Sequence, residues 1–374
     1  MNWLIARFEL ARNGVTGNVR PMEGLRGFAV FLVFLVHYVT LVKPWTADTP
    51  ALQAVSRAMH SAGNTGVDLF FVLSGLLIYG SLIARAQNFF IFMGRRIERI
   101  YPAYVVVLAL YLALSFLFPS ESKFPATSWS SGVYFLQNYL LLPGLFPIEP
   151  IVTVAWSLSY EMFFYLSIPL AIAALGLRNR TVCSRITLFL ITAAAMLVYC
   201  AGYGGHVRLT MFLAGMVLYE ALGVPRERAP RSLWALLALV LGLSSAILFA
   251  GSTTAQALKV GVIACAFFLL CFTCFANPYG AAGRFYAWTP MRWLGNMSYS
   301  YYLIHGLALK GAFLFLAFVV PATPDEPILF WVLLVPMFAI TLVPSAALFL
   351  LIERPLSLAP SAARASHSRF ASAR

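Results

Sequence analysis

The stretch RPMEGLRGFAVFLVFLVHY, from Arg20 to Tyr38, is an apolar run that carries one arginine and one histidine. Arg26 and His37 are eleven positions apart, so in a helix they share one face and lie about 16 Å apart along the axis. The hydrocarbon core of a bilayer is ~30 Å thick. The stretch therefore predicts a membrane helix with a basic group at one edge of the bilayer and an imidazole near its middle, which indicates a polar track entering the membrane.

The whole chain has the composition of a membrane protein. Of its 374 residues, 61% are hydrophobic and 10% are charged, against about 45–50% and 25% in soluble domains. The net charge of +13 does not indicate a nucleic-acid partner, because the basic residues lie in short loops between apolar runs. The five cysteines are odd in number and lie mostly within apolar runs, so we expect neither a disulfide framework nor a metal site.

Apolar runs long enough to span a bilayer recur along the sequence. There are ten, at residues 25–42, 66–84, 100–118, 152–175, 185–201, 208–222, 232–250, 256–275, 298–320 and 328–352. The longest loop, 119–151, contains VYFLQNYLLLPGLF, which we expect to be re-entrant or interfacial. The sequence predicts an all-α polytopic membrane protein with an N-terminal segment 1–20, a transmembrane domain 21–355 and a tail 356–374.

The basic residues predict the orientation. Twenty of the 26 Lys and Arg residues fall in the N-terminal segment, in alternate loops, in the tail or at the helix ends beside them. The positive-inside rule places these parts in the cytoplasm, so both termini are predicted to be cytoplasmic. The N-terminal segment lacks the continuous apolar core of a signal peptide, and we expect it to be retained.

Counting ~1.5 Å per residue from each predicted membrane entry places three polar side chains in one layer. They are His37, Ser74 in GVDLFFVLSGLLIYG and Glu161 in VAWSLSYEMFFYL. A carboxylate at such a depth is costly unless it is paired or functional, which favours a functional role for Glu161. For Ser74, a small-residue packing contact between helices is the alternative.

Three further polar residues extend the predicted path. Asp68 is expected near the outer surface, where it would otherwise only cap the start of its helix. Arg208 is expected at the outer end of its helix. His305, in SYSYYLIH, enters from the cytoplasmic side, and its alternative role is a hydrogen bond to a neighbouring helix.

The sequence RRIERIYP, residues 95–102, is a basic cluster on the predicted cytoplasmic side. Arg95 and Arg99 are spaced i, i+4 and would share a helical face, from which they and Arg96 would clamp phosphates in fork geometry. The alternative is an ordinary positive-inside loop.

Taken in order, these motifs resemble the acyltransferase 3 family of integral-membrane O-acyltransferases. The resemblance rests on MEGLRGFAVFLVFLVH, GVDLFFVLSGLLI, RRIERIYPAY, AWSLSYEMFFYL, VRLTMFLAGMVLYE, SYSYYLIH and a closing ERP at 353–355. It implies a ten-helix protein of the bacterial inner (cytoplasmic) membrane. Such a protein transfers an acyl group, usually acetyl from cytoplasmic acetyl-CoA, to a hydroxyl of a glycan or other acceptor. Glu23 stands where the family commonly has Asp, which conserves the charge near Arg26.

The resemblance assigns functional roles to Arg26 and His37 and extends them to Glu161 and to the arginines of RRIERIYP. We expect His37 to deprotonate the acceptor or relay the acyl group, with Glu161 orienting it. The coenzyme A phosphates would be held by Arg26, Arg95, Arg96 and Arg99, and supporting or substrate-binding roles would fall to Asp68, Ser74, Arg208 and His305. Acetyl-CoA is the expected co-substrate, and no metal is expected.

Some family members carry an esterase-like periplasmic domain after the membrane part, whereas this chain ends about twenty residues after its last predicted helix. A second transfer step would therefore be absent or fall to a separate periplasmic or polysaccharide-assembly partner. Two other classes of protein remain open. A transporter or flippase would use the same buried residues, usually with repeats between its halves, and the sequence shows no such repeat. A purely structural scaffold would tolerate apolar residues in place of His37 or Glu161.

Overall fold

The computed structural model describes residues 2–10, 19–46, 49–125, 128–249, 251–320 and 326–358. Within these ranges the chain is helical and contains no β-strand. The helices are α1 (Asn2–Phe8), α2 (Val19–Leu41), α3 (Pro50–Ala84), α4 (Phe89–Leu117), α5 (Ser128–Tyr139), α6 (Trp156–Ala174), α7 (Val182–Tyr203), α8 (Thr210–Gly223), α9 (Leu233–Leu248), α10 (Thr253–Ala276), α11 (Ala281–Tyr286), α12 (Thr289–Asn296), α13 (Ser298–Val319), α14 (Leu329–Val332) and α15 (Leu334–Leu348), which continues into a π-helical segment, Phe349–Leu358. Parts of the predicted terminal segments, residues 11–18 and 359–374, lie outside the described ranges.

Every predicted apolar run folds as helix. Eight helical stretches of the described chain are long and apolar enough to cross a membrane, which confirms an all-α polytopic membrane protein. Two of the ten predicted runs form shorter helices, α8 with 14 residues and α9 with 16. At ~1.5 Å per residue, these two are shorter than a ~30 Å hydrocarbon core.

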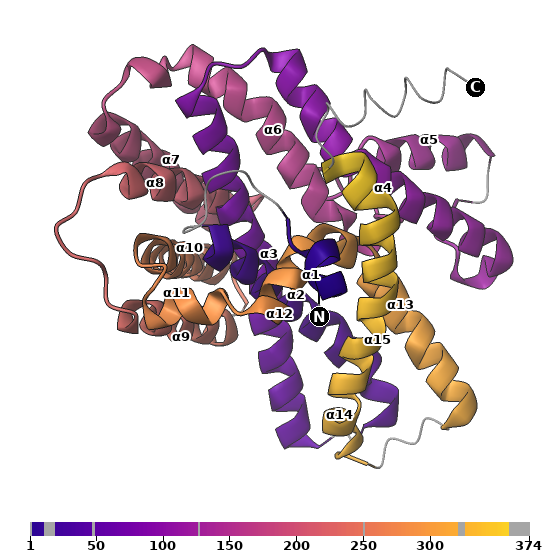
Figure 1. Cartoon of the computed structure of the whole chain (residues 1–374). Coiled ribbons are helices and arrows are strands. Elements are labelled where there is room, and N and C mark those ends of the chain that lie inside the picture. Colours follow the sequence, from indigo (N-terminus) through magenta and orange to yellow (C-terminus); the bar gives the residue numbers. More distant parts are fainter. Residues whose placement is uncertain are drawn as a thin grey trace.

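Helix α3 runs through the centre of the molecule, with α7 to α10 on one side and α4, α13 and α15 on the other (Figure 1). It begins at Pro50 and has 35 residues, whereas the apolar run predicts a start near residue 66. The earlier start has a local cause, because the side chain of Thr49 accepts a hydrogen bond from the backbone N–H of Leu52 at 3.3 Å and Pro50 occupies the first helical position. At ~1.5 Å per residue this helix is about 52 Å long, well beyond a ~30 Å core.

Helix α4 also begins earlier than its apolar run predicts. The side chain of Asn88 caps it by accepting hydrogen bonds from the backbone N–H groups of Phe90 at 2.9 Å and Ile91 at 3.3 Å. The basic cluster of residues 95–102 therefore lies within a helix and not in a loop. Its helical setting fixes which arginines share a face.

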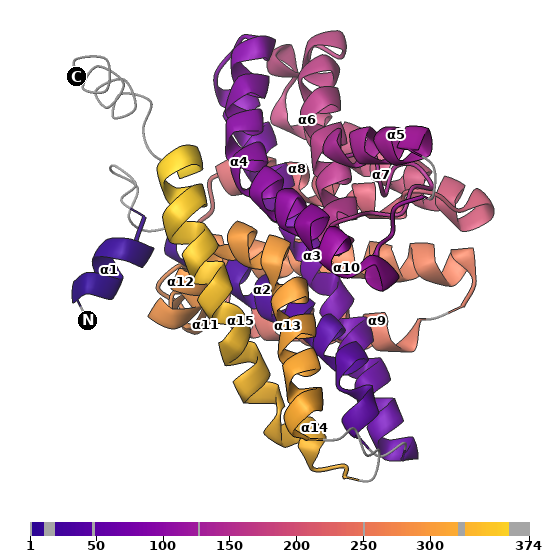
Figure 2. The ribbon, with the colours of Figure 1, turned by 90° about the vertical axis from the view of Figure 1, so that its right-hand side faces the viewer.

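The predicted non-spanning piece of the long loop is largely the helix α5, which has 12 residues and is too short to span a bilayer. It lies beside α4 (Figure 2). The hydroxyl of Tyr104 donates to the carbonyl of Asn138 at 2.7 Å, and that of Tyr101 donates to the carbonyl of Tyr139 at 3.1 Å. These two bonds hold α5 against α4.

Helices α2 and α3 run antiparallel and approach so closely that glycine is required at their contact. A Cβ at Gly66 would lie 2.5 Å from the carbonyl oxygen of Ala29, and one at Gly63 would lie 2.6 Å from that of Leu32. On another face of α3, Gly75 meets the backbone of α8 in the same way. Because glycine has no side chain, the helix backbones touch directly and the register between them is fixed.

The described ends of the chain meet. Phe8 of α1 stacks on Phe349 with ring centroids 5.8 Å apart, and Arg354 donates hydrogen bonds to the carbonyls of Arg7 at 2.7 Å and Ala6 at 2.8 Å. The two ends therefore lie together, as the predicted orientation with both termini on one side of the membrane requires. That this side is the cytoplasm stays a prediction.

Candidate active site

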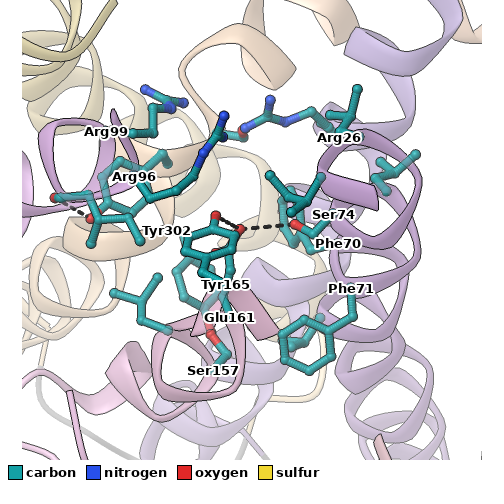
Figure 3. Close-up of a pocket in the computed structure, with 18 residues that line it drawn as sticks. Arg26, Phe70, Phe71, Ser74, Arg96, Arg99, Ser157, Glu161, Tyr165 and Tyr302 are labelled. Atoms are coloured by element: carbon teal, nitrogen blue, oxygen red, sulfur yellow. Dashed lines mark hydrogen bonds between the residues drawn. The ribbon is translucent and has the colours of Figure 1, made fainter. Parts of the chain in front are cut away.

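A cavity of about 150 Å³ opens between α2, α3, α4, α6 and α13. Figure 3 shows Arg26, Arg96 and Arg99 together on one side of this pocket, with Phe71 and Ser157 on the opposite side. The other labelled lining residues are Phe70, Ser74, Glu161, Tyr165 and Tyr302. The pocket therefore combines a cationic wall, one carboxylate and an aromatic wall, which suits an elongated anionic ligand with an apolar portion.

The carboxylate of Glu161 is held by two hydroxyl groups. Ser74 donates to its Oε1 from α3 at 3.0 Å, and Tyr165, one turn farther along α6, donates to the same oxygen. The predicted meeting of Ser74 and Glu161 is thus confirmed. Tyr165 was missed by the sequence analysis, although its i, i+4 spacing from Glu161 would have placed it on the same helical face.

His37 does not share this layer, and the prediction is wrong for it. Because α2 and α3 are antiparallel, with Gly63 level with Leu32, the eleven residues from Gly63 to Ser74 lead about 16 Å back toward the start of α2. Ser74 is therefore level with the Arg26 end of α2. The error arose because the count assumed that the apolar runs of α2 and α3 are level, whereas α3 begins at Pro50, well before residue 66, and packs this earlier part against α2.

The structure places His37 against His305 of α13 and not against Glu161. The two imidazole rings have centroids 4.9 Å apart and an angle of 71° between their planes. His305 is fully buried. The hydrogen bonds of Glu161 go to Ser74 and Tyr165 instead, so the expectation that Glu161 orients His37 finds no contact to support it.

Tyr302 stands between the pocket and the two histidines. It lines the pocket, and its ring centroid is 6.2 Å from that of His305, one turn farther along α13. Its hydroxyl shares a hydrogen bond of 2.7 Å with the hydroxyl of Ser157 and donates to the carbonyl of Val154 at 3.0 Å. Neither Tyr302 nor Ser157 was singled out from the sequence, because only the fold brings α6 and α13 together.

The arginines of the basic cluster take different positions from those predicted. Arg96 and Arg99, spaced i, i+3, line the pocket, whereas Arg95 is exposed and points elsewhere. Arg99 also forms a 2.6 Å ion pair with the fully buried carboxylate of Glu353. The pocket therefore gives no support to a clamp that includes Arg95. Glu353, known from sequence only as part of a closing motif, is the partner that orients Arg99.

Arg96 lies against aromatic rings. Its guanidinium carbon is 5.8 Å from the ring centroid of Tyr165 and 5.3 Å from that of Phe92. Such cation–π contacts do not use the N–H donors, and the buried Nε of Arg96 has no hydrogen-bond partner among the described residues. The N–H edge of a guanidinium matches the oxygens of a phosphate group.

Asp68 and Arg208 form an ion pair, with 3.6 Å between Arg208 Nε and Asp68 Oδ1. Asp68 is 2% exposed and lies near the middle of α3, so it does not cap the helix as the sequence alternative supposed. Arg208 lies in the turn before α8, and its guanidinium is 5.3 Å from the ring centroid of Trp156. This pair is separate from the cationic wall of the pocket.

Glu23 lies on α2, one turn before Arg26, and its ion-pair partner was not predicted from the sequence. Its Oε2 accepts a 3.0 Å hydrogen bond from Nε of Arg292 on α12, and both side chains are buried. Arg292 also pairs with Glu9, the residue after α1. The start of α2, which carries Arg26, is therefore anchored to α12 by charge as well as by packing.

The known proteins similar to this chain include three from different bacteria. O-acetyltransferase OatA of Staphylococcus aureus is 30% identical over 220 residues, covering 53% of this chain and 34% of the relative. The putative peptidoglycan O-acetyltransferase YrhL of Bacillus subtilis is 26% identical over 317 residues, covering 76% of this chain and 47% of the relative. An uncharacterized protein of Haemophilus influenzae is 37% identical over 117 residues, which is 28% of this chain and 47% of the relative.

The chain thus spans about a third to a half of the length of these relatives. No solved structure matches it significantly. A family model described as an acyltransferase domain matches residues 21–350, a span that includes the cationic wall, Glu161, His37 and His305. Because that match covers most of the sequence, the chain belongs to the acyltransferase 3 family.

Proposed function

We propose that this protein is a membrane O-acyltransferase that takes an acetyl group from cytoplasmic acetyl-CoA and transfers it to a hydroxyl of a cell-surface or exported glycan. The observation that carries the proposal is the pocket in which Arg26, Arg96 and Arg99 face the carboxylate of Glu161, with the half-buried His37 and the fully buried His305 in ring contact farther along α2 and α13. Family membership and the names of the bacterial relatives support it.

The donor would lie along this axis. The phosphate groups of coenzyme A would bind the cationic wall, where planar guanidinium groups offer paired N–H donors to phosphate oxygens. The pantetheine arm would pass the aromatic wall, and an amide N–H of the arm would donate to Glu161. The thioester would then point past Tyr302 toward His37. Arg26 and His37 lie about 16 Å apart along α2, which is close to the reach of an extended pantetheine arm.

The chemistry requires a base for the acceptor. One nitrogen of His37 takes the proton of the acceptor hydroxyl while the hydroxyl oxygen forms a bond to the thioester carbonyl carbon. The tetrahedral intermediate collapses by breaking the carbon–sulfur bond. The coenzyme A thiolate then takes the proton from the His37 imidazolium, so that the products are an O-acetyl ester and coenzyme A with a free thiol.

The names of the relatives support the proposed acceptor class and membrane location. Two of the relatives are named as O-acetyltransferases, one of them as a putative peptidoglycan O-acetyltransferase. We therefore place this protein in a bacterial cytoplasmic membrane, with its donor pocket on the cytoplasmic side and a polysaccharide as acceptor.

The test compares His37→Ala with the wild type in a strain that lacks the gene. Mass spectrometry of surface glycans should show O-acetyl groups with the wild type and none with His37→Ala. The purified variant should still be stabilised against heat by acetyl-CoA, since a ligand at a hundred times its Kd stabilises the folded state by ~2.7 kcal/mol. Full acetylation by a stably inserted His37→Ala protein would refute the proposed base.

The same experiment distinguishes an acyltransferase from a transporter or flippase. A transporter or flippase would move its substrate without any acyl donor, and acetyl-CoA would not stabilise the purified protein. A wild type with no thermal response to acetyl-CoA, together with unchanged O-acetylation of glycans on deletion of the gene, would therefore favour that class over the acyltransferase.

A further inference from the structure

The histidine pair contains an unsatisfied nitrogen that the proposed chemistry has not used. His305 is fully buried, and its Nε2 has no hydrogen-bond partner among the described residues. Its ring lies against that of His37, with centroids 4.9 Å apart. A buried polar atom without a partner is unfavourable and is retained only where it serves some purpose.

The backbone of α13 determines the tautomer of His305. Its Nδ1 lies 2.9 Å from the carbonyl oxygen of Tyr301 and 2.9 Å from that of Tyr302. Carbonyl oxygens only accept hydrogen bonds, so Nδ1 carries the proton. In a neutral imidazole the other nitrogen is then an acceptor, and the bare lone pair of His305 is on Nε2.

The two tyrosines whose rings lie beside His305 have hydroxyl groups that are already engaged. The hydroxyl of Tyr301 shares a 2.8 Å hydrogen bond with Thr341, and that of Tyr302 bonds Ser157 and a backbone carbonyl. The neighbouring group with an N–H to offer is the imidazole of His37. The ring of His37 already lies against that of His305, with 4.9 Å between their centroids.

We propose that His305 is a positioning residue whose Nε2 accepts a hydrogen bond from His37 and thereby selects the tautomer of His37. This inference rests on the proposed function, in which His37 is the base. The proton of His37 stays on the nitrogen that faces His305, and the other nitrogen presents its lone pair to the acceptor hydroxyl. When His37 takes the hydroxyl proton, it has an N–H on both nitrogens, and His305 continues to accept from one of them.

Two substitutions of His305 separate this role from a merely structural one. The amide nitrogen of Asn mimics Nδ1, so His305→Asn retains the bond to the carbonyls of α13 and loses the acceptor at the Nε2 position. The amide of Gln reaches the Nε2 position, so His305→Gln retains an acceptor for His37 and loses the bond to α13. A structural role predicts that Asn is the better replacement, whereas the positioning role predicts Gln.

The readout that needs no acceptor is NMR of the purified protein labelled with ¹⁵N in its histidine side chains. The chain has five histidines, so the spectrum is assignable by substitution. In the wild type and in His305→Gln, the two nitrogens of His37 should have the distinct shifts of a single tautomer. In His305→Asn they should move toward the average of two tautomers. His206→Gln is the matched control, since His206 bonds Tyr160 at 2.8 Å and should leave the shifts of His37 unchanged.

Surface O-acetylation supplies the second readout. His305→Asn should acetylate about a hundredfold more slowly, at the lower end of what acid–base catalysis contributes, with unchanged acetyl-CoA affinity, and His305→Gln should stay within about tenfold of the wild type. Unchanged His37 shifts in His305→Asn, or a Gln variant as impaired as the Asn variant, would overturn the inference. Failure of the proposed function is seen separately, as full acetylation by His37→Ala.

Discussion

Arg96→Ala should weaken the binding of acetyl-CoA strongly, whereas Arg95→Ala should leave it almost unchanged. The two residues are adjacent on α4 and carry the same charge, but Arg96 lines the pocket and Arg95 is exposed outside it. Comparing them separates a direct contact with the ligand from a general loss of positive charge at the predicted cytoplasmic surface. The positive-inside explanation of this cluster predicts equal effects for both.

The magnitude follows from the contacts that Arg96 can make. Its guanidinium is packed against Tyr165 and Phe92, so little side-chain entropy is lost when a phosphate binds. A hydrogen bond to a charged group contributes ~1.5–3 kcal/mol, which corresponds to an increase in Kd of about 10- to 150-fold. The exposed charge of Arg95 is screened within ~8 Å at physiological ionic strength, so its removal should change Kd by less than about twofold.

Isothermal titration of acetyl-CoA into detergent-purified protein measures both constants. Titration of coenzyme A without the acetyl group should give the same ratio between the two variants, because the lost contact is to phosphate. Thermal unfolding without ligand controls for damage to the fold. The reasoning would be refuted by equal Kd values for Arg96→Ala and Arg95→Ala, or by a larger effect of Arg95→Ala.

Three further predictions concern stability and are checked by thermal unfolding of the purified variants. Glu353→Gln should lower the free energy of unfolding by about 3 kcal/mol, because it leaves the charge of the largely buried Arg99 without its carboxylate partner; a loss below the error of the measurement would contradict this. Gly66→Ala should destabilise the folded protein by about 1–3 kcal/mol, because the added methyl group would overpack against α2. Gly94→Ala on α4, where the space around the glycine is open, should instead stabilise it by up to ~1 kcal/mol. Similar effects at both sites would disprove the close contact. Asp68→Asn should destabilise as well, and removing its arginine partner in addition should cost less than the sum of the single changes, as a double-mutant cycle measures.

The helices were predictable from the sequence, but their starting points were not. The apolar run near residue 66 marks where α3 becomes apolar on all sides, whereas its first turns, after the cap at Thr49, are polar on one face and give no such signal. The predicted depths depend on where each apolar run begins, and they therefore place His37 level with Ser74, which the structure does not. Ser74 and Glu161 still meet as predicted, because the packing that displaces α2 relative to the apolar run of α3 leaves the contact between α3 and α6 unaffected.

Contacts between residues far apart in the sequence could not be predicted for a different reason. Arg99 and Glu353 are 254 positions apart, and no periodicity links them. The same holds for His37 and His305, which were each noted as polar residues within apolar helices but not as neighbours. A helical pattern reports which face of a helix is polar, whereas only packing shows which polar faces meet.

The rigidity of the α2–α3 pair bears directly on the choice of donor. Backbone contacts at Gly63 and Gly66 prevent α2 from sliding along α3, and the ion pair between Glu23 and Arg292 anchors its first turn. Arg26 and His37 lie on one continuous helix, so the ~16 Å between them does not close when a ligand binds. On the proposed mechanism the donor itself must bridge this gap, with its phosphates at one end and its acyl group at the other. Coenzyme A thioesters have that shape, whereas a short donor such as acetyl phosphate places its acyl group next to its phosphate and would reach only one end.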